Sequence, residues 1–421
     1  MMGLIRDIAA VVLVISTLTF IAFFGRLPAF RKTPIGFLHR LLWIHVPRSC
    51  AALDTFLTGG RLSASASRTG TYLFYEKHFV VTFFFLSLLT GSAALFLPPT
   101  WPFISSFQKG LVFLLVPLPY IFTYFCQTSG PGSPHIITAE TYQSHLGHYP
   151  FDHVLYHPDN ICRTCAIPKP ARSKHCSICK ACVARADHHC VWVNNCLGRG
   201  NYKHFLGLLF FTSIVLLYGS YLAISTLRPQ VTDHIKQYPQ WHKLDYDSPG
   251  TLTERFMAMW EYWIDVLGTA FMVGGISRGG VGMLSTLTAP LPLGLLAYHV
   301  YLIWAGMTTN ETSKWGDIRE DMDDGEVFIA ELKNSGLDLA SASMSAMDGV
   351  DYCEESFESA WPQRSRQFLI RTYDGQPPKN VRPQIADLII HNSWRRTWHL
   401  GDVENIYDLG FWGNLVEVLV N

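Results

Sequence analysis

Seven of the ten cysteines of this chain fall within residues 162–196, and three histidines lie among them. The spacing is C-x2-C, then C-x2-C-x2-C, then two single cysteines; the residues are Cys162, Cys165, Cys176, Cys179, Cys182, Cys190 and Cys196, with His175, His188 and His189. Repeated C-x2-C spacing is typical of zinc sites, because zinc takes four nitrogen or sulfur ligands in a tetrahedron. The alternative, a cluster of disulfides, applies only in an oxidising compartment.

The number of these residues exceeds what two zinc ions need. Two Cys3His sites would use six cysteines and two histidines, which leaves one of each. A cysteine beside a histidine can act as a nucleophile with its base, and Asp187 beside His188 can orient the imidazole. The spacing does not say which cysteine is left over. Cys190, next to the pair His188-His189, is the natural candidate.

The composition of the rest of the chain is that of a membrane protein. Hydrophobic residues make up 49% of the 421 residues and charged ones 16%, against roughly 25% charged in an average soluble domain. This composition excludes a disordered or fibrous protein, and the formal net charge of zero argues against nucleic acid as a general partner. Five almost uncharged runs are long enough to be membrane-spanning helices: 8–25, 79–97, 111–126, 205–227 and 283–307.

Basic residues between these runs predict the topology. They gather in 26–78 and 127–203, so both segments are expected to be cytosolic, with the N-terminus lumenal, the 228–282 loop lumenal and the C-terminal tail cytosolic. Cytosolic thiols stay reduced, which favours zinc over disulfides. A cleaved signal peptide is the alternative for the first run, but basic residues follow it directly. Residues 266–276 are apolar but too short to cross alone, so we expect an interfacial or lumenal helix there.

Four regions follow from this topology. We expect three spans with a cytosolic 26–78 loop in 1–126, a zinc-binding domain in 127–203, two spans with a lumenal loop in 204–307, and a cytosolic tail in 308–421. Within the tail, residues 317–359 are acidic and rich in Ser, Met and Ala, which predicts a mostly disordered segment. The fold class is thus an all-α polytopic membrane protein with a small cytosolic cysteine-rich domain.

The run Asp187-His188-His189-Cys190, inside this cysteine pattern and between apolar spans, resembles the DHHC family of protein S-acyltransferases, or palmitoyltransferases. The match continues through 169–173, 175–176, 191–198 and 201–202, the TTxE motif at Thr308-Thr309-Asn310-Glu311, and the C-terminal aromatic motif at 405–410 with Asn414. Segments 23–28 and 31–36 resemble the fungal spore-wall-formation branch, whose members have five predicted spans. One departure is Gly130, where most members carry the Asp of Asp-Pro-Gly.

The resemblance implies a division of the ligands and a two-step reaction. One zinc ion would be held by Cys162, Cys165, His175 and Cys182, and a second by Cys176, Cys179, His189 and Cys196. Cys190 would accept the acyl chain of a fatty acyl-CoA, with His188 as its base and Asp187 holding the imidazole, and would pass the chain to a substrate cysteine. Candidates for the CoA phosphates are Lys169, Arg172 and Lys174, although the positive-inside bias explains them equally well. Supporting roles fall to Thr308, Thr309, Glu311, Asn405 and Tyr407.

The expected substrates are membrane-associated proteins with cytosolic cysteines, such as SNARE-type proteins with a juxtamembrane cysteine. The expected location is the endoplasmic reticulum membrane, with the Golgi as the alternative. Two other functions compete with the enzyme. A zinc-stabilised membrane scaffold would keep its function without Cys190. A transporter or channel would carry ionisable residues inside its spans, of which His299 is the main example.

Overall fold

The computed structural model describes residues 18, 21, 32–128, 135–158, 160–239, 251–333, 361–379, 381–391 and 393–420. The chain forms two compact units, the first from 1–78, 91–104 and 220–284 and the second from 79–90, 105–219 and 285–421. Three features of the sequence lie outside the described residues: almost all of the first apolar run, 8–25, the segment 23–28 and the departure at Gly130.

Four apolar helical stretches in the described part of the chain are long enough to cross a membrane: Val80–Phe103, Ser106–Gln127, Tyr202–Gln237 and Leu252–Trp304. At most 39% of the most apolar window of each stretch is buried against protein. A helix pairs most of its backbone polar groups internally, and these windows leave most of their residues unburied by protein, which is what lipid requires. The prediction of a polytopic, mainly helical membrane protein is therefore confirmed.

The helix boundaries differ from the predicted runs at prolines. The run 111–126 was expected to be one helix, but α6 (Ser106–Leu115) and α7 (Leu118–Gln127) are separated next to Pro117, which has no N–H to donate. The run 283–307 likewise divides into α11 (Val281–Thr288) and α12 (Pro290–Trp304). Residues 266–275 do not form a separate short helix; they are the second half of α10 (Leu252–Gly275), which begins with a Thr251–Glu254 capping box and leads through η5 (Ile276–Gly280) into α11.

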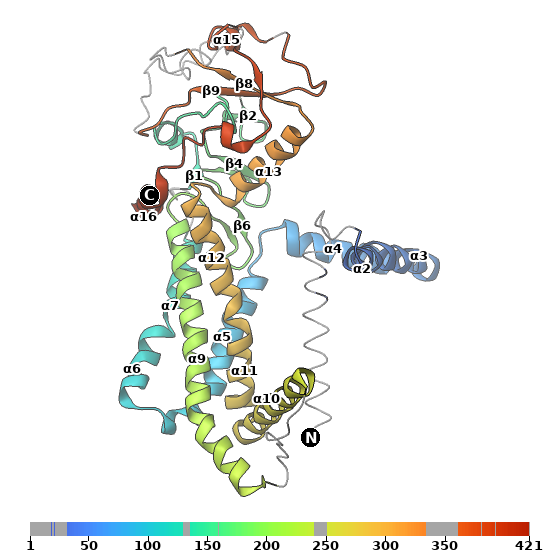
Figure 1. Ribbon diagram of the computed structural model, residues 1–421, viewed down its shortest axis with the longest axis vertical. Coiled ribbons are helices and arrows are strands. Elements are labelled where there is room, and N and C mark those ends of the chain that lie inside the picture. Colours follow the sequence, from blue (N-terminus) through green and yellow to red (C-terminus); the bar gives the residue numbers. More distant parts are fainter. Residues whose placement is uncertain are drawn as a thin grey trace. The chain divides into compact units, whose positions relative to one another are not determined.

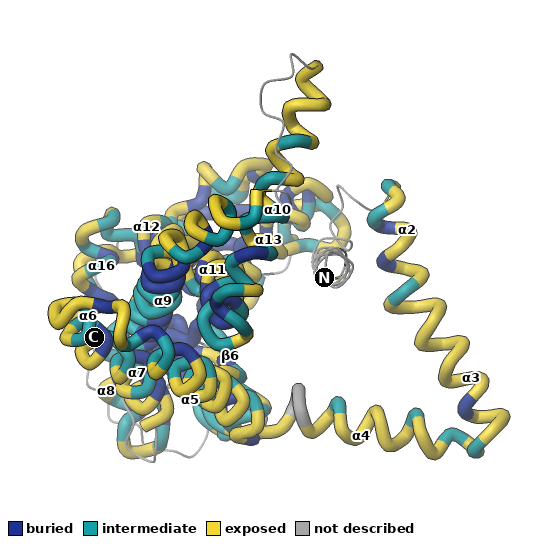
Figure 2. Tube along the Cα trace, turned by 90° about the horizontal axis from the view of Figure 1, so that it is seen from below, coloured by how far each residue is buried: buried dark blue, intermediate teal, exposed yellow. Residues whose placement is uncertain are grey.

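The first unit contains a run of helices that follows the first apolar run: α2 (Pro34–Arg40), η2 (Leu41–His45), α3 (Val46–Thr58) and α4 (Arg61–Tyr75). Figure 2 shows most of α3 and α4 as exposed. The chain turns between them at Gly59 and Gly60, whose φ values of 71° and 85° favour glycine. Within this unit Gly282 of α11 lies against Ala223 of α9 (Tyr202–Gln237), because a Cβ at Gly282 would come within 2.4 Å of the Ala223 side chain.

The second unit combines the first half of α5 (Val80–Thr100), α6, α7, the start of α9, the end of α11 and α12 with all the strands of the described residues. The rest of α5 and η3 (Trp101–Phe103), which follows it, belong to the first unit. The cysteine-rich segment contains β1 (Ile136–Ile137), α8 (Tyr142–Leu146), β2 (Ile161–Cys162), β3 (Ile167–Pro168), β4 (Lys174–Cys176), β5 (Ala181–Val183), β6 (His189–Cys190) and β7 (Asn195–Cys196). All their pairings are antiparallel, in a β1-β5-β4 sheet and two hairpins, β2-β3 and β6-β7. Strands this short bury too little apolar surface to be stable alone.

The C-terminal tail completes the second unit. It contains α13 (Thr309–Asp323), β8 (Val327–Glu331), β9 (Gln367–Arg371), α15 (Pro383–Ala386), β10 (Arg395–Arg396), η6 (Leu400–Asp402) and α16 (Gly410–Val420). Its strands form a second antiparallel sheet in the order β10-β8-β9. In Figure 1 both groups of strands lie at the end of this unit where α9 begins and α12 ends.

The prediction of disorder in 317–359 is wrong for its first part. Residues 317–323 belong to α13, and β8 is buried at four of its five positions. Ile318 and Met322 pack with Val327 and Ile329 in one core cluster, to which β9 contributes Leu369. Composition alone does not predict the order of residues 317–331, because the strand that pairs with β8 lies about forty residues further along the chain. Residues 334–360 lie outside the described part of the chain.

Candidate active site and metal centres

The structure gathers eight cysteine and histidine side chains into two groups of four. In the first, the Nδ1 atom of His175 lies 3.5 Å from the sulfur of Cys162, 3.3 Å from that of Cys165 and 3.9 Å from that of Cys182. In the second, His189 Nδ1 lies 3.8, 3.4 and 3.6 Å from the sulfurs of Cys176, Cys179 and Cys196. Zinc bonds of about 2.3 Å to sulfur and about 2.0 Å to nitrogen, at the tetrahedral angle, would separate the two atoms by about 3.6 Å. Both groups therefore fit zinc.

Strand geometry decides which residue belongs to which group. Neighbouring residues in a strand point to opposite faces, so His175 and Cys176 in β4 serve different groups. Across the ladder, His175 lies opposite Cys182 and His189 lies opposite Cys196, which brings each pair into one group. The two groups are thus interleaved along the chain.

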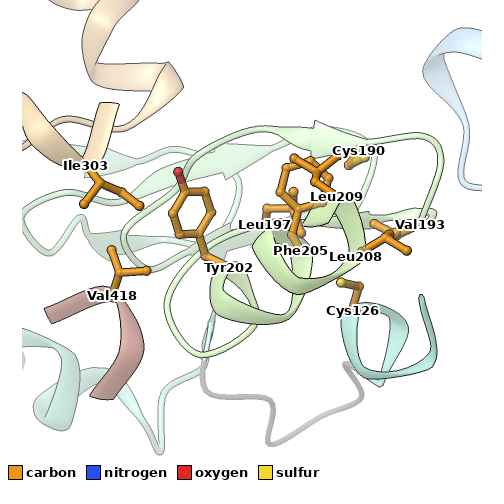
Figure 3. Close-up of a cluster of buried hydrophobic side chains, with 10 residues drawn as sticks. All are labelled: Cys126, Cys190, Val193, Leu197, Tyr202, Phe205, Leu208, Leu209, Ile303 and Val418. Carbon is orange, nitrogen blue, oxygen red and sulfur yellow. The ribbon is translucent and has the colours of Figure 1, made fainter. Parts of the chain in front are cut away.

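The same alternation separates Cys190 from the metal ligands. Cys190 follows His189 in β6, so its side chain points to the opposite face, and it belongs to neither group of four. Cys190 is only 4% exposed and lies in an apolar cluster with Val193 and Leu197, completed by Phe205, Leu208 and Leu209 from the first turns of α9, among others. Figure 3 shows this cluster, with Cys190 beside the α9 side chains. The cysteine left over by the metal sites thus faces apolar helix surface.

His188 connects Cys190 to Asp187. Its Nδ1 atom lies 2.6 Å from Oδ2 of Asp187, and its imidazole also shares a side-chain hydrogen bond with Cys190. Burial lowers the pKa of His188, but the hydrogen bonds to Asp187 and Cys190 outweigh burial and raise it to about 10. Because a raised pKa favours the protonated form, His188 is suited to hold the proton that the neighbouring thiol gives up.

The beginning of α13 holds Asp187 in place. The Thr309 amide donates to Oδ1 at 2.8 Å, and the Thr309 hydroxyl donates to Oδ2 at 3.0 Å. A carboxylate at a helix N-terminus is favoured by the unpaired amides and the helix dipole. Burial raises the pKa of Asp187, but its hydrogen bonds and the nearby His188 outweigh burial and lower it. Asp187 is therefore ionised and can stabilise a protonated His188.

The TTxE motif is a helix-capping box with a second role. The Thr308 hydroxyl accepts from the amide of Glu311 at 3.2 Å, and the Glu311 carboxylate accepts from the amide of Thr308 at 2.9 Å. Glu311 also binds Arg172, whose Nε and Nη2 atoms lie 2.8 and 2.7 Å from the two carboxylate oxygens. Both side chains are 1% exposed, and the Tyr156 hydroxyl donates a further bond at 3.1 Å. The pair therefore fixes α13 against the cysteine-rich segment. The same helix holds Asp187 through Thr309.

We expect Glu311→Leu to destabilise the second unit by about 3–5 kcal/mol, because it leaves the Arg172 guanidinium buried without a partner. Hydrogen–deuterium exchange should show faster exchange throughout α13 and the cysteine-rich segment. Glu320→Gln, an exposed change on the same helix, serves as the control and should leave exchange unchanged. The double variant Arg172→Met/Glu311→Leu should recover much of the loss. Wild-type exchange in Glu311→Leu would contradict the prediction.

Two residues of the C-terminal motif contact the cysteine-rich segment and the end of α12. The Tyr407 ring centre lies 4.7 Å from the Arg172 guanidinium, and its hydroxyl donates to the Pro150 carbonyl at 2.8 Å. The Asn405 amide donates to the Ala305 carbonyl at the end of α12 at 3.4 Å. Gly306 permits this approach, since its φ is 63° and a Cβ there would meet Asp408 at 2.6 Å. Of the two, Tyr407 packs on the Arg172–Glu311 pair, and neither belongs to the apolar cluster around Cys190.

The three candidates for CoA phosphates differ in their surroundings. Arg172 is buried and bound to Glu311, so it has no free surface for a phosphate, and this part of the prediction is wrong. Lys169 and Lys174 line a cleft of about 290 Å³. Lys314 of α13 is the third lysine in that cleft, with its Nζ atom 3.7 Å from the ring centre of Tyr156. Sequence reasoning missed Lys314, although its position three residues after Glu311 places both on one side of α13.

A second buried ion pair fastens α16 to the cysteine-rich segment. Arg185 Nε lies 2.8 Å from Oε1 of Glu417, which also accepts a bond from the Tyr149 hydroxyl. The two charged side chains are 6% and 5% exposed. No sequence signal marks Glu417, because it lies in an apolar terminal run. A buried charge of this kind needs the partner that only the tertiary structure supplies.

Comparison with known proteins agrees with this geometry. Residues 155–316 match the model of the DHHC palmitoyltransferase family. The chain is 40% identical to palmitoyltransferase SWF1 of Neurospora crassa, over 100% of this chain and 93% of that protein. It is 39% identical to palmitoyltransferase swf1 of Emericella nidulans, over 100% of this chain and 98% of that protein. With palmitoyltransferase swf1 of Schizosaccharomyces pombe the identity is 33%, over 76% and 83% of the two chains.

Proposed function

Because this chain belongs to the DHHC palmitoyltransferase family, and is therefore a protein S-palmitoyltransferase, we propose that its reaction runs through an acyl-enzyme on Cys190. The observation that carries this proposal is the chain of contacts from Cys190 through His188 to Asp187. Eight other cysteine and histidine side chains form the two metal groups, so the Cys190 thiol is not needed as a ligand and can act as the nucleophile.

The reaction comprises two exchanges of one thioester for another. First, His188 takes the proton of Cys190, the thiolate attacks the acyl-CoA carbonyl, and the C–S bond to CoA breaks. The CoA thiolate leaves with the proton from His188. In the second exchange, His188 takes the proton of a substrate thiol, whose thiolate attacks the Cys190 thioester. The C–S bond to Cys190 breaks, and the released Cys190 thiolate takes the proton back from His188. Asp187 keeps the imidazole oriented and stabilises its cation in both steps.

The surroundings of Cys190 support a long-chain donor. The apolar cluster around Cys190 extends along α9 and α12, both of which belong to the membrane-spanning stretches. Moving a methylene group from water into such surroundings is worth about 0.8 kcal/mol. We place the acyl chain of palmitoyl-CoA, or of another long-chain acyl-CoA, among these helices.

Two zinc ions, held by the two groups of four, would fix the geometry of this site. Zinc bound by four protein ligands is structural and has no open position for a substrate. The ligands come from short strands and their connections, so the ions would supply much of the folding energy of the segment. The β6–β7 hairpin, closed by His189 and Cys196, would hold Cys190 rigidly at the start of α9.

The direct test is to map the covalent intermediate. Purified protein is mixed with palmitoyl-CoA without a protein substrate, stopped with acid and digested. We expect one palmitoylated peptide that contains Cys190 and loses its acyl group in hydroxylamine, as a thioester does. A palmitoyl group on another cysteine, with none on Cys190, would contradict the proposal. A zinc-stabilised scaffold without catalysis would show no adduct.

The cleft lined by Lys169, Lys174 and Lys314 is our candidate for the CoA phosphates, and it predicts a pH dependence. Burial lowers the pKa of Lys314 to about 8, since it outweighs the nearby Glu311 and Asp152 carboxylates. Lys314 is therefore charged below about pH 8 and loses its charge above it. We expect the dissociation constant of palmitoyl-CoA to rise about threefold to tenfold between pH 7 and pH 9.

Binding is measured with Cys190→Ala protein, so that no acyl transfer intervenes. Lys314→Arg, which stays charged, should flatten this pH dependence, whereas Lys333→Arg, outside the cleft, should leave it as in the parent protein. An equal rise in Lys314→Arg would remove Lys314 from the binding site.

We propose membrane-associated substrates with cytosolic cysteines close to the bilayer, including SNARE-type proteins with a juxtamembrane cysteine. The support is that Cys190 lies where α9 begins, at an end of a membrane-spanning helix. We also propose the endoplasmic reticulum membrane as the location, as the resemblance to the fungal spore-wall-formation branch implies. The basic residues in 26–78 and 127–203 support a cytosolic position for the cysteine-rich segment. Comparison of palmitoylated proteins in cells with wild-type protein and with Cys190→Ala would identify the substrates.

A further inference from the structure

His299 is a buried imidazole that the reaction proposed above does not use. It lies in α12, inside a membrane-spanning stretch, and is 1% exposed. A polar ring is costly within a membrane span, so such residues commonly serve a function. As a single residue, His299 gives little support to a transporter. Its neighbours point instead to the active site.

The contacts of His299 are with the catalytic side chains and their supports. Its ring is stacked on the His188 ring, with centres 5.9 Å apart and planes at 26°. A ring nitrogen of His299 lies within 4.8 Å of both a carboxylate oxygen of Asp187 and a ring nitrogen of His188. The Phe205 ring meets both imidazoles edge to face, at 5.6 Å from His188 and 5.2 Å from His299. All four residues belong to the second unit.

Tyr202, the first residue of α9, determines which ring nitrogen of His299 carries the proton. Its hydroxyl lies 2.9 Å from His299 Nδ1, and this is the one partner of that hydroxyl among the described residues. A buried hydroxyl left without an acceptor is costly, so the hydroxyl donates and Nδ1 accepts. The His299 proton then lies on Nε2, and the ring is neutral. A second cation here would oppose the positive charge that His188 acquires during the reaction.

We propose that His299 is a positioning residue for His188: with its tautomer fixed by Tyr202, it supports one face of the His188 ring. It thereby keeps Nδ1 of His188 on Asp187 while the ring shares a hydrogen bond with Cys190. The face of the neutral imidazole also meets the cation formed at His188, as an aromatic ring meets a cation. This inference rests on the proposed roles of Cys190 and His188, and adds to them a residue from a membrane helix.

The test is the rate of acylation of Cys190 in a single turnover at saturating palmitoyl-CoA, together with KM and the zinc content. His299→Ala is expected to slow acylation about 10-fold to 100-fold, because a misplaced base costs up to about 100-fold. KM should stay within about threefold, since His299 is not proposed to touch the donor, and zinc should be unchanged. Tyr202→Phe, which removes only the hydroxyl, should slow acylation less. Tyr301→Phe, on an exposed part of α12, is the matched control and should react at the wild-type rate.

A double-mutant cycle separates positioning from a general loss of structure. Because Tyr202 acts through His299, the variant Tyr202→Phe/His299→Ala should be no slower than His299→Ala alone. Additive losses, an acylation rate of His299→Ala within twofold of wild type, or a loss seen only as raised KM would overturn the inference. So would a third metal ion that disappears in His299→Ala, because the Asp187–His188–His299 group would then be a metal site. Full acylation of Cys190→Ala protein would instead contradict the proposed function itself.

Discussion

Cys190→Ala protein is expected to form no acyl-enzyme and to transfer palmitate at least about 10⁴-fold more slowly than wild type. The loss is this large because, in the proposed mechanism, the nucleophile, its base and the group that orients the base act as one unit, so removing the nucleophile leaves the others without a function. The measurement is transfer of radiolabelled palmitate from palmitoyl-CoA, first to the protein itself and then to a peptide with a membrane-proximal cysteine.

The control for Cys190→Ala is Cys50→Ala, which removes an exposed cysteine of α3 outside the cluster. It should label and transfer as wild type does. Cys190→Ala should keep its metal content, because Cys190 lies on the face of β6 opposite to the ligand His189. Equal labelling of wild type and Cys190→Ala would show that another residue carries the acyl group.

Removal of one ligand from either metal group is expected to be the most damaging change to the fold. Cys165→Ala in the first group, or Cys179→Ala in the second, should lower the zinc content from two ions per chain to one. Structural zinc is worth about 10 kcal/mol or more in small domains, and the strands here are only two or three residues long. We therefore expect the segment 135–199 to become accessible to proteases and to hydrogen exchange.

Elemental analysis of purified protein measures the zinc content, and Cys190→Ala serves as the matched cysteine-to-alanine control with two ions per chain. Because the groups are interleaved, loss of one ion should also weaken the other site, through β4, which supplies a ligand to each. Two ions retained in Cys165→Ala, or one ion lost in Cys190→Ala, would contradict the division of the ligands.

The two ion pairs explain why the tail takes part in the site. Arg172–Glu311 joins the cysteine-rich segment to α13, and Arg185–Glu417 joins it to α16. Because α13 also donates two hydrogen bonds to Asp187, the first pair couples the position of the tail to that carboxylate, which we propose orients His188. Changes far from Cys190, such as Glu311→Leu, should therefore lower activity through the orientation of His188.

The sequence by itself determined the features that depend on local patterns. Absence of charge over about twenty residues marks a membrane span, since lipid excludes charge wherever the span lies in the fold. The C-x2-C spacing marks zinc, because two cysteines at that distance reach one ion from a single turn. Together with the run 187–190, these patterns indicated the family, and they predict the metal and the reacting cysteine.

Only the tertiary structure decided the features that depend on distant partners. From the sequence alone, Arg172 is expected to be a surface cation. The structure places Glu311, 139 residues further along the chain, beside it. Residues 317–333 read as a disordered acidic segment until β9 supplies the apolar surface on which β8 packs. His299 reads as an isolated polar residue until α9 and α12 bring it onto Tyr202 and His188. In each case the free energy of burying a charge, a strand or a ring depends on the residue that packs against it. The local sequence pattern does not indicate which residue that is.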